Sequence, residues 1–139
     1  MTAVTVVKDI MSSDVVTVTP ETSVYAAARV MAQEEVGSVV VVVGEKPVGI
    51  ITERDLVRKV LAGGLSPRKT SVSKVMSSPV VVVGENTSLE EAVSIMAQNR
   101  IRRLLVVSGE KLVGIVSATD IMKALGAEAA RALPAILRG

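Results

Sequence analysis

The 139-residue chain repeats itself, and this repeat limits its fold more than any other feature. Residues 7–60 align without gaps on residues 72–125, at an offset of 65 residues, and 22 of the 54 aligned pairs are identical. Self-similarity over this length indicates two copies of one structural unit. A unit of about 60 residues buries only a modest share of its surface when it is alone, so we expect the two copies to pack against each other.

Both copies predict the same order of elements: strand, helix, strand, strand and helix. In the first copy we expect strands at 15–18, 39–43 and 48–51, an amphipathic helix from about residue 24 and a helix at 53–61. The second copy predicts strands at 80–83, 104–107 and 112–116, with helices from about residue 89 and at 118–125. Gly-Glu-Lys joins the last two strands of each copy, which is typical of a hairpin. Thr87 and Glu90 have the spacing of a capping box, so Thr87 is the expected N-cap of the helix that follows it.

The predicted fold class is therefore α/β, or α+β in some schemes, with two β-α-β-β-α repeats packed sheet to sheet with pseudo-twofold symmetry. We expect a first domain at residues 7–61, a linker at 62–71, a second domain at 72–125 and a C-terminal tail at 126–139. The linker is rich in glycine and charge, and the Ala-rich tail predicts a short helix at 127–137 that Pro134 interrupts. Two similar copies should generate two equivalent clefts between them, and we expect the functional sites to lie in these clefts.

Composition excludes several classes of chemistry. The sequence contains no histidine and no cysteine, so it offers no imidazole base, thiol nucleophile or thiolate metal ligand. We therefore expect no catalytic residue and no metal site, and we predict that the chain is not an enzyme. Its longest uninterrupted aliphatic run, at residues 39–43, is far shorter than the roughly 20 residues that span a bilayer. No signal peptide is recognisable at its start, and we predict a cytoplasmic protein with no membrane partner.

The most informative segment is the junction of the third strand with the second helix, which occurs twice. A hydroxyl ends the strand, at Thr52 and Ser117, and a carboxylate follows three positions later, at Asp55 and Asp120. A hydroxyl beside the free amides of a helix start suits a phosphate, and a carboxylate can accept hydrogen bonds from both hydroxyls of a ribose. The same spacing also fits a helix cap without any ligand. Both interpretations remain open at this point.

With these junctions, the sequence resembles the CBS domain (cystathionine beta-synthase domain) family, and specifically a stand-alone tandem pair, or Bateman module. The resemblance covers residues 7–125 and rests on the doubled Gly-x-x-Thr/Ser-x-x-Asp motif, the two Met-Ser-Ser openings, Gly-Ser-Val-Val-Val-Val at 37–42 and Arg-Ile-Arg-Arg-Leu-Leu-Val-Val at 100–107. It implies that the clefts bind adenosine-containing ligands, such as AMP, ADP, ATP or, in some members, S-adenosylmethionine. It also implies that binding changes the arrangement of the domains.

The resemblance further implies which residues contact the ligand. In one cleft, Asp120 would hold the ribose, Ser117 and Thr119 the ribose or phosphate, and Thr22 and the backbone near Gly37 would give polar contacts. The adenine in this cleft would lie against Val16, Ala27 and Val36. The second cleft would use Thr52, Arg54, Asp55, Val81, Thr87, Ala92 and Ile101. Because Glu53 is acidic where a phosphate would approach, we expect this second cleft to prefer a neutral nucleoside or to stay empty.

Arg102 and Arg103 are the predicted phosphate ligands of the first cleft. The family commonly places a basic residue or histidine there, and a guanidinium can clamp phosphate oxygens. The first copy has Gly37 and Ser38 at the equivalent positions, so the two clefts differ in charge. The alternative is that these arginines are a solvated strand entry or form ion pairs across a dimer interface, with Glu34 and Glu35 as partners.

Together these features predict a non-enzymatic regulatory module that binds AMP, ADP or ATP and signals to a partner protein that the sequence does not identify. S-adenosylmethionine ranks behind the nucleotides, and no catalytic cofactor is expected. Apolar helix faces predict a homodimer. The alternative function is a nucleic-acid-binding or protein-interaction module that uses basic residues such as Arg58 and Lys69. Nucleic acid ranks behind the nucleotides because the net charge is only +2 and stacking aromatics are missing.

Overall fold

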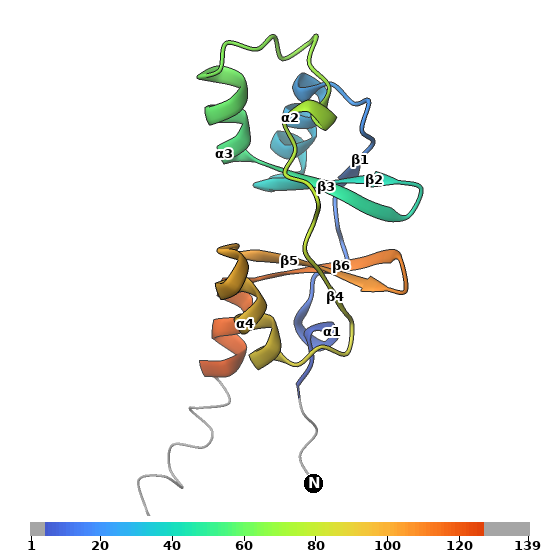
Figure 1. Ribbon diagram of the computed structural model, residues 1–139, viewed down its shortest axis with the longest axis vertical. Coiled ribbons are helices and arrows are strands. Elements are labelled where there is room, and N and C mark those ends of the chain that lie inside the picture. The colour runs from blue at the N-terminus through green and yellow to red at the C-terminus, as the bar shows by residue number, and fades with distance from the viewer. Residues whose placement is uncertain (1–4, 127–139) are drawn as a thin grey trace, which may run out of the picture. The chain divides into compact units, whose positions relative to one another are not determined.

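The structure, a computed structural model, describes residues 5–126, which form two compact units (Figure 1). The first-repeat unit consists of Asp14–Val80 and Glu110–Leu112. The second-repeat unit consists of residues 5–13, Val81–Gly109 and residues 113–126. The tail helix predicted at 127–137 lies outside the described residues.

Each unit contains a three-stranded sheet with the same topology. The strands of the first-repeat unit are β1 (Thr17–Val18), β2 (Ser38–Val43) and β3 (Lys46–Thr52), in the order β1-β2-β3. The second-repeat unit has β4 (Val82–Gly84), β5 (Arg103–Ser108) and β6 (Lys111–Ser117), in the order β4-β5-β6. β1 and β4 run parallel to their neighbours, while β2 and β3 form the predicted antiparallel hairpin. Gly44 and Gly109 begin the two hairpin turns at φ of 63° and 64°, which glycine adopts without steric cost.

Helices complete each unit, so the predicted mixed α/β fold class is confirmed. The first-repeat unit contains α2 (Val24–Glu34) and α3 (Glu53–Asp55), which continues as the π-helical segment η1 (Leu56–Leu61). The second-repeat unit contains α4 (Leu89–Asn99), and residues 118–126 are α-helical. The N-cap of α4 is Ser88, whose Oγ accepts a hydrogen bond from Glu91 N at 3.1 Å. The predicted N-cap Thr87 is therefore wrong by one residue, because its carbonyl is instead the acceptor for Val7 N.

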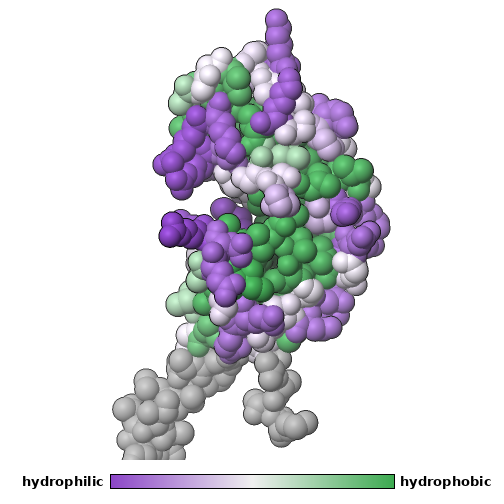
Figure 2. Space-filling model, in the orientation of Figure 1, coloured by the Kyte–Doolittle hydropathy of each residue, from purple (hydrophilic) through white to green (hydrophobic). Residues whose placement is uncertain are grey.

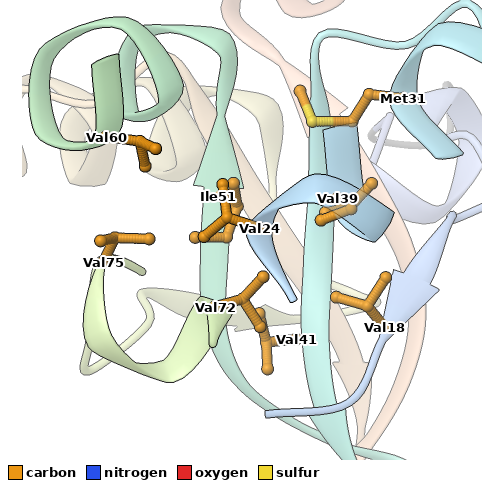
Figure 3. Packing of buried hydrophobic residues seen from close by; sticks show 10 residues of the cluster. Val18, Val24, Met31, Val39, Val41, Ile51, Val60, Val72 and Val75 are labelled. Carbon is orange, nitrogen blue, oxygen red and sulfur yellow. The ribbon is translucent and has the colours of Figure 1, made fainter. Parts of the chain in front are cut away.

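The core of each unit lies between the sheet and its first helix. In the first-repeat unit, Val39, Val41 and Ile51 point from one face of the sheet toward Val24 and Met31 of α2 (Figure 3). All five are at most 4% exposed. The second-repeat unit repeats this arrangement with Leu89, Met96, Leu104, Val106 and Val116. Burying each such side chain stabilises the unit by about 1.5–3 kcal/mol, so the strand alternation fixes which sheet face meets the helix.

Two short elements that the sequence did not predict open the two copies, and each packs in the unit built by the other copy. They are α1 (Val7–Ile10) and the 3-10 turn η2 (Val72–Lys74). Val7, from the first copy, is fully buried in the core of the second-repeat unit, and Val72, from the second copy, is fully buried in the core of the first-repeat unit. Val72 N also donates to Thr22 O at 2.8 Å. The compact units therefore interleave the two sequence copies.

The Met-Ser segment that follows each opening element lies directly on the third strand of its unit. Ser77 N donates to Ile50 O at 3.0 Å, and the equivalent Ser12 N donates to Ile115 O at 2.9 Å. The methionine before each serine packs directly against a glycine of the strand. A Cβ built on Gly49 would overlap Sδ of Met76, and one built on Gly114 would overlap Sδ of Met11. Glycine is required at these positions for close approach and not for an unusual φ.

Replacing Gly49 with alanine should destabilise the protein, because the added methyl group would overlap Met76. Overpacking of this kind costs about 1–3 kcal/mol in the free energy of unfolding. Urea denaturation of Gly49→Ala in the wild-type and in the Met76→Ala background measures the coupling of the two positions. We expect Gly49→Ala to cost less once Met76 has been truncated.

Gly84→Ala is the matched control. Gly84 also lies in a strand, but a Cβ on it meets no atom within 4 Å. Its free energy of unfolding should stay within about 0.5 kcal/mol of the wild-type value. If Gly49→Ala cost the same in both backgrounds, the close contact with Met76 would not be the cause.

Candidate functional site

The strand-to-helix junction of the first-repeat unit is closed by a capping box between Thr52 and Asp55. Thr52 Oγ1 accepts a hydrogen bond from Asp55 N at 3.2 Å. In return, Asp55 Oδ2 accepts from Thr52 N at 3.0 Å and from Thr52 Oγ1 at 3.1 Å. Glu53 N, the next free amide of this helix start, donates to Gly37 O at 3.0 Å. The capping interpretation therefore holds for this junction.

The second oxygen of Asp55 is also occupied. Lys59 Nζ lies 3.1 Å from Asp55 Oδ1, and it donates a further hydrogen bond to Val75 O at 2.9 Å. Asp55 itself is only 8% exposed. The sequence analysis missed this role of Lys59, although an acid followed four residues later by a base in a helix is a recognisable signal.

The equivalent junction of the second-repeat unit is open. Ser117 Oγ accepts from Asp120 N at 3.1 Å, and Ala118 N donates to Arg102 O at 2.8 Å, so the helix start is held as in the first unit. The carboxylate of Asp120, however, is exposed and accepts no hydrogen bond or ion pair from any residue of the described part of the chain. The alanine at position 124 stands where the first copy has Lys59.

Five polar residues of the predicted first cleft, Arg102, Arg103, Ser117, Thr119 and Asp120, lie in the unit that contains this junction, whereas Thr22 and Gly37 lie in the other unit. The bond between Ala118 N and Arg102 O ties the entry of β5 to the helix that carries Thr119 and Asp120. Arg102 and Arg103 are exposed, and within residues 5–126 neither forms an ion pair, with Glu34 and Glu35 or with any other acid. Two guanidinium groups and a free carboxylate are thus available to a ligand in one unit.

The apolar residues that were predicted to contact the ligand divide into two groups. Val16, Val36, Val81 and Ile101 are half-buried and pack on the core of their own unit, so part of each side chain stays accessible. Ala27 and Ala92 are 0% exposed, and neither presents any surface to a ligand. These two residues belong to the core, because the first helix of each unit turns them toward its sheet.

The remaining residues that were predicted to contact the ligand are polar. Thr22 Oγ1 accepts from Thr19 N at 3.2 Å and lies 3.1 Å from the Thr19 hydroxyl, so it is part of a local turn. Thr87 is half-buried and its carbonyl accepts from Val7 N at 2.8 Å, while Arg54 is exposed. Each predicted cleft takes residues from both units. Within one unit, therefore, the structure gathers Arg102, Arg103, Ser117, Thr119 and Asp120, and within the other Gly37, Thr52, Arg54 and Asp55.

Other kinds of site are missing from the described residues. Residues 5–126 contain no group of three or more acidic, histidine or cysteine side chains that could hold a metal ion. No helix in this part of the chain has both the length and the hydropathy needed to cross a bilayer. The two strand-to-helix junctions remain the places where chemistry is concentrated.

Comparison with known proteins identifies both copies. The CBS domain family matches residues 7–62 and again residues 72–127. The CBS domain-containing protein YhcV of Bacillus subtilis is 42% identical over 115 residues, which cover 83% of this chain and 81% of YhcV. The uncharacterized protein MK0525 of Methanopyrus kandleri is 40% identical over 119 residues, or 84% of this chain, which spans 61% of that protein.

Solved structures agree with this assignment. A putative signal-transduction protein with CBS domains from Burkholderia ambifaria superposes with a TM-score of 0.80 at 35% identity, covering 87% of this chain and 93% of that chain. The CBS domain pair of protein MJ0100, solved in complex with 5′-methylthioadenosine and S-adenosyl-L-methionine, gives a TM-score of 0.80 at 27% identity, covering 91% of this chain and 99% of that chain. The chain therefore belongs to the CBS domain family of regulatory modules, as a tandem pair of CBS domains.

Proposed function

We propose that this CBS pair is a non-enzymatic sensor that binds an adenosine-containing nucleotide, AMP, ADP or ATP, at the Asp120 junction and signals to a partner protein. The observation that carries this proposal is the carboxylate of Asp120, which is exposed and unpaired among the described residues, at a helix start whose cap hydroxyl, Ser117 Oγ, already accepts from the Asp120 amide. A carboxylate free of internal partners can accept both hydroxyls of a ribose.

Charge around the junction favours a phosphorylated ligand. Arg102 and Arg103 supply two exposed guanidinium groups at the entry of β5, and the Arg102 carbonyl is bonded to the same helix start that presents Asp120. Ser117 and Thr119 add hydroxyl groups at this end of the helix. Guanidinium groups bind phosphate oxygens in bidentate geometry, so the proposed arrangement places ribose on Asp120 and phosphate on the arginines.

The complex of MJ0100 supports the adenosine part of the ligand, because both molecules bound by that CBS pair contain adenosine. Neither of those two ligands carries a phosphate. Methylthioadenosine offers the exposed pair Arg102 and Arg103 no anionic group, and S-adenosylmethionine offers one carboxylate, whereas a nucleotide offers one to three phosphates. This difference in charge is why the nucleotides rank first for this chain.

Binding of single-stranded nucleic acid ranks behind nucleotide sensing. Tyr25 is the one aromatic residue of the sequence, and stacking on aromatic rings is the usual basis of such binding. The guanidinium carbon of Arg68 lies 3.9 Å from the centroid of the Tyr25 ring, and the phenol oxygen of Tyr25 accepts from Arg29 at 3.3 Å. One face of the ring is therefore already covered.

Replacing Asp120 with alanine should weaken AMP binding by about 1.5–3 kcal/mol, or roughly 10- to 150-fold, because hydrogen bonds to a charged group carry that free energy. Isothermal titration calorimetry measures the affinity. Ser88→Ala is the control, since it removes the N-cap of α4 in the same unit. It should lower the free energy of unfolding by about 1 kcal/mol with no change in affinity. An Asp120→Ala variant that binds AMP normally would reject the ribose role.

The double variant Arg102→Met/Arg103→Met should distinguish phosphate contacts from contacts to the nucleoside. We expect AMP and ATP affinities to fall at least tenfold, since charge-assisted hydrogen bonds are lost, while adenosine binds as tightly as to the wild type. Competition titrations with the three ligands provide the comparison. Equal losses for adenosine and AMP would mean that the arginines act on the fold and not on phosphate.

We also propose that the chain forms a homodimer through its helices. Val57, Leu61 and Met122 are 57%, 78% and 62% exposed, although all three are large apolar side chains on the second helix of a unit. An apolar groove of about 340 Å³ lies beside Met122, lined also by Val93, Met96 and Ile101. Hydrophobic surface also remains on the visible face of the second-repeat unit (Figure 2). Exposed apolar patches usually mark contacts with another protein.

Light scattering of the purified protein tests this proposal. The expected mass is twice 14.5 kDa, and Leu61→Glu should shift it toward the monomer because a charge would be buried at the contact. Lys46→Glu, on an exposed strand end away from these helices, is the control and should stay dimeric. A wild-type mass near 14.5 kDa would exclude the dimer.

A further inference from the structure

The two strand-to-helix junctions have nearly the same residues but different internal partners. In both, the hydroxyl of Thr52 or Ser117 accepts from the amide of the motif aspartate, at 3.2 Å and 3.1 Å. The bond of Glu53 N to Gly37 O also has its equivalent, from Ala118 N to Arg102 O, so the junctions differ in the contacts of the motif carboxylate. The Asp55 carboxylate accepts three further close contacts, while that of Asp120 has none within the described residues.

Thr52 supplies two of these contacts, both to Oδ2 of Asp55, and Lys59 supplies the third, to Oδ1. The Nζ of Lys59 binds Asp55 Oδ1 and the Val75 carbonyl at once, and we refer to these two contacts as the Lys59 latch. The side chain of Lys59 stays 45% exposed, whereas that of Asp55 is 11% exposed, so the lysine covers the carboxylate from the solvent side. Position 124 of the second copy, four residues after Asp120, carries an alanine that cannot make such a contact.

A ribose that took Asp55 would have to break both contacts of the latch. The carboxylate would exchange a cation for neutral hydroxyl groups while remaining poorly exposed. The Val75 carbonyl would lose its donor as well, and Val75 is only 4% exposed. Leaving buried polar groups without partners costs free energy. The hydrogen bonds that a ribose could form with Asp55 would therefore be offset by the loss of the two contacts of Lys59.

We infer that Lys59 keeps the Asp55 junction closed, so that the chain takes one adenosine ligand, at Asp120, and not two. This inference rests on the proposed nucleotide-binding function. On this inference, the residue four positions after the motif aspartate determines whether a ligand can reach the carboxylate. Lysine at this position closes the junction, and alanine leaves it open.

Removing the latch should add a site. Calorimetric titration with adenosine, which carries no phosphate that Glu53 would repel, is expected to give about one ligand per chain for the wild type and about two for Lys59→Met, which keeps an unbranched side chain of similar length and loses the amine. Adding Asp120→Ala to Lys59→Met should return the stoichiometry to about one, with the remaining site at Asp55. Thermal unfolding of each variant confirms that it is folded.

Adding a lysine at position 124 should close the Asp120 junction. Ala124→Lys places an amine four residues after Asp120 and is expected to weaken AMP binding about tenfold or more. Ala124→Met has a side chain of similar length without the charge, and should bind AMP as the wild type does. Equal losses in the lysine and methionine variants would show that bulk, and not the amine, acts at this position, and would overturn this half of the inference.

The outcomes separate the inference from the proposed function. Wild-type protein that binds one adenosine, with folded Lys59→Met also binding one, overturns the latch and leaves ligand binding at Asp120 intact. Two adenosine molecules per wild-type chain overturn the latch in the same way. Wild-type protein that binds no AMP, ATP or S-adenosylmethionine overturns the proposed function, and the inference with it.

Discussion

In each unit a methionine approaches a strand glycine closely, and this contact fixes where the opening segment lies on the sheet. Met76 crosses Gly49 and Met11 crosses Gly114, and the serine after each methionine exchanges two backbone hydrogen bonds with the neighbouring strand residue. These contacts bring an opening segment against the third strand, immediately before the junction that carries the motif aspartate. The geometry of the candidate site thus depends on the absence of a side chain at two positions of the sequence.

The two copies keep their packing residues and change their polar ones. Core positions on the strands are aliphatic in both, such as Val39 with Leu104 and Ile51 with Val116. Around the motif the copies diverge. Gly37 and Ser38 align with Arg102 and Arg103, and Lys59 aligns with an alanine. Packing residues are shared by the two units, whereas the polar residues pair the motif carboxylate in one junction and leave it without a partner among the described residues in the other.

Much of the fold could be predicted from the sequence, because runs of valine and leucine mark the buried central strands and helical periodicity marks the buried face of each first helix. The elements that were missed, α1 and η2, are only four and three residues long, too short to show a period, and long-range packing creates them. At the site, the spacing of Thr52 with Asp55 and of Ser117 with Asp120 located both junctions. It did not by itself reveal that Lys59 pairs with the carboxylate of Asp55, although the i, i+4 spacing of these two residues is visible in the sequence. Nor did it reveal that Ala27 and Ala92 are fully buried, because that depends on how the helix is rotated against its sheet. The prediction that the Asp55 cleft prefers a neutral nucleoside or stays empty rested on Glu53, and the contacts of Lys59 with Asp55 and Val75 were no part of it.

The interleaving of the copies has a consequence for how the chain can be divided. A break in the linker at 62–71 would leave the first fragment without Val72 and Val75, and the second without Val7, although each of these side chains fills the core of a unit built mostly from the other fragment. Neither half of the sequence contains all the residues of one hydrophobic core. The duplication has therefore made the two copies mutually dependent, and the smallest piece of this protein that can fold with both cores complete is the pair.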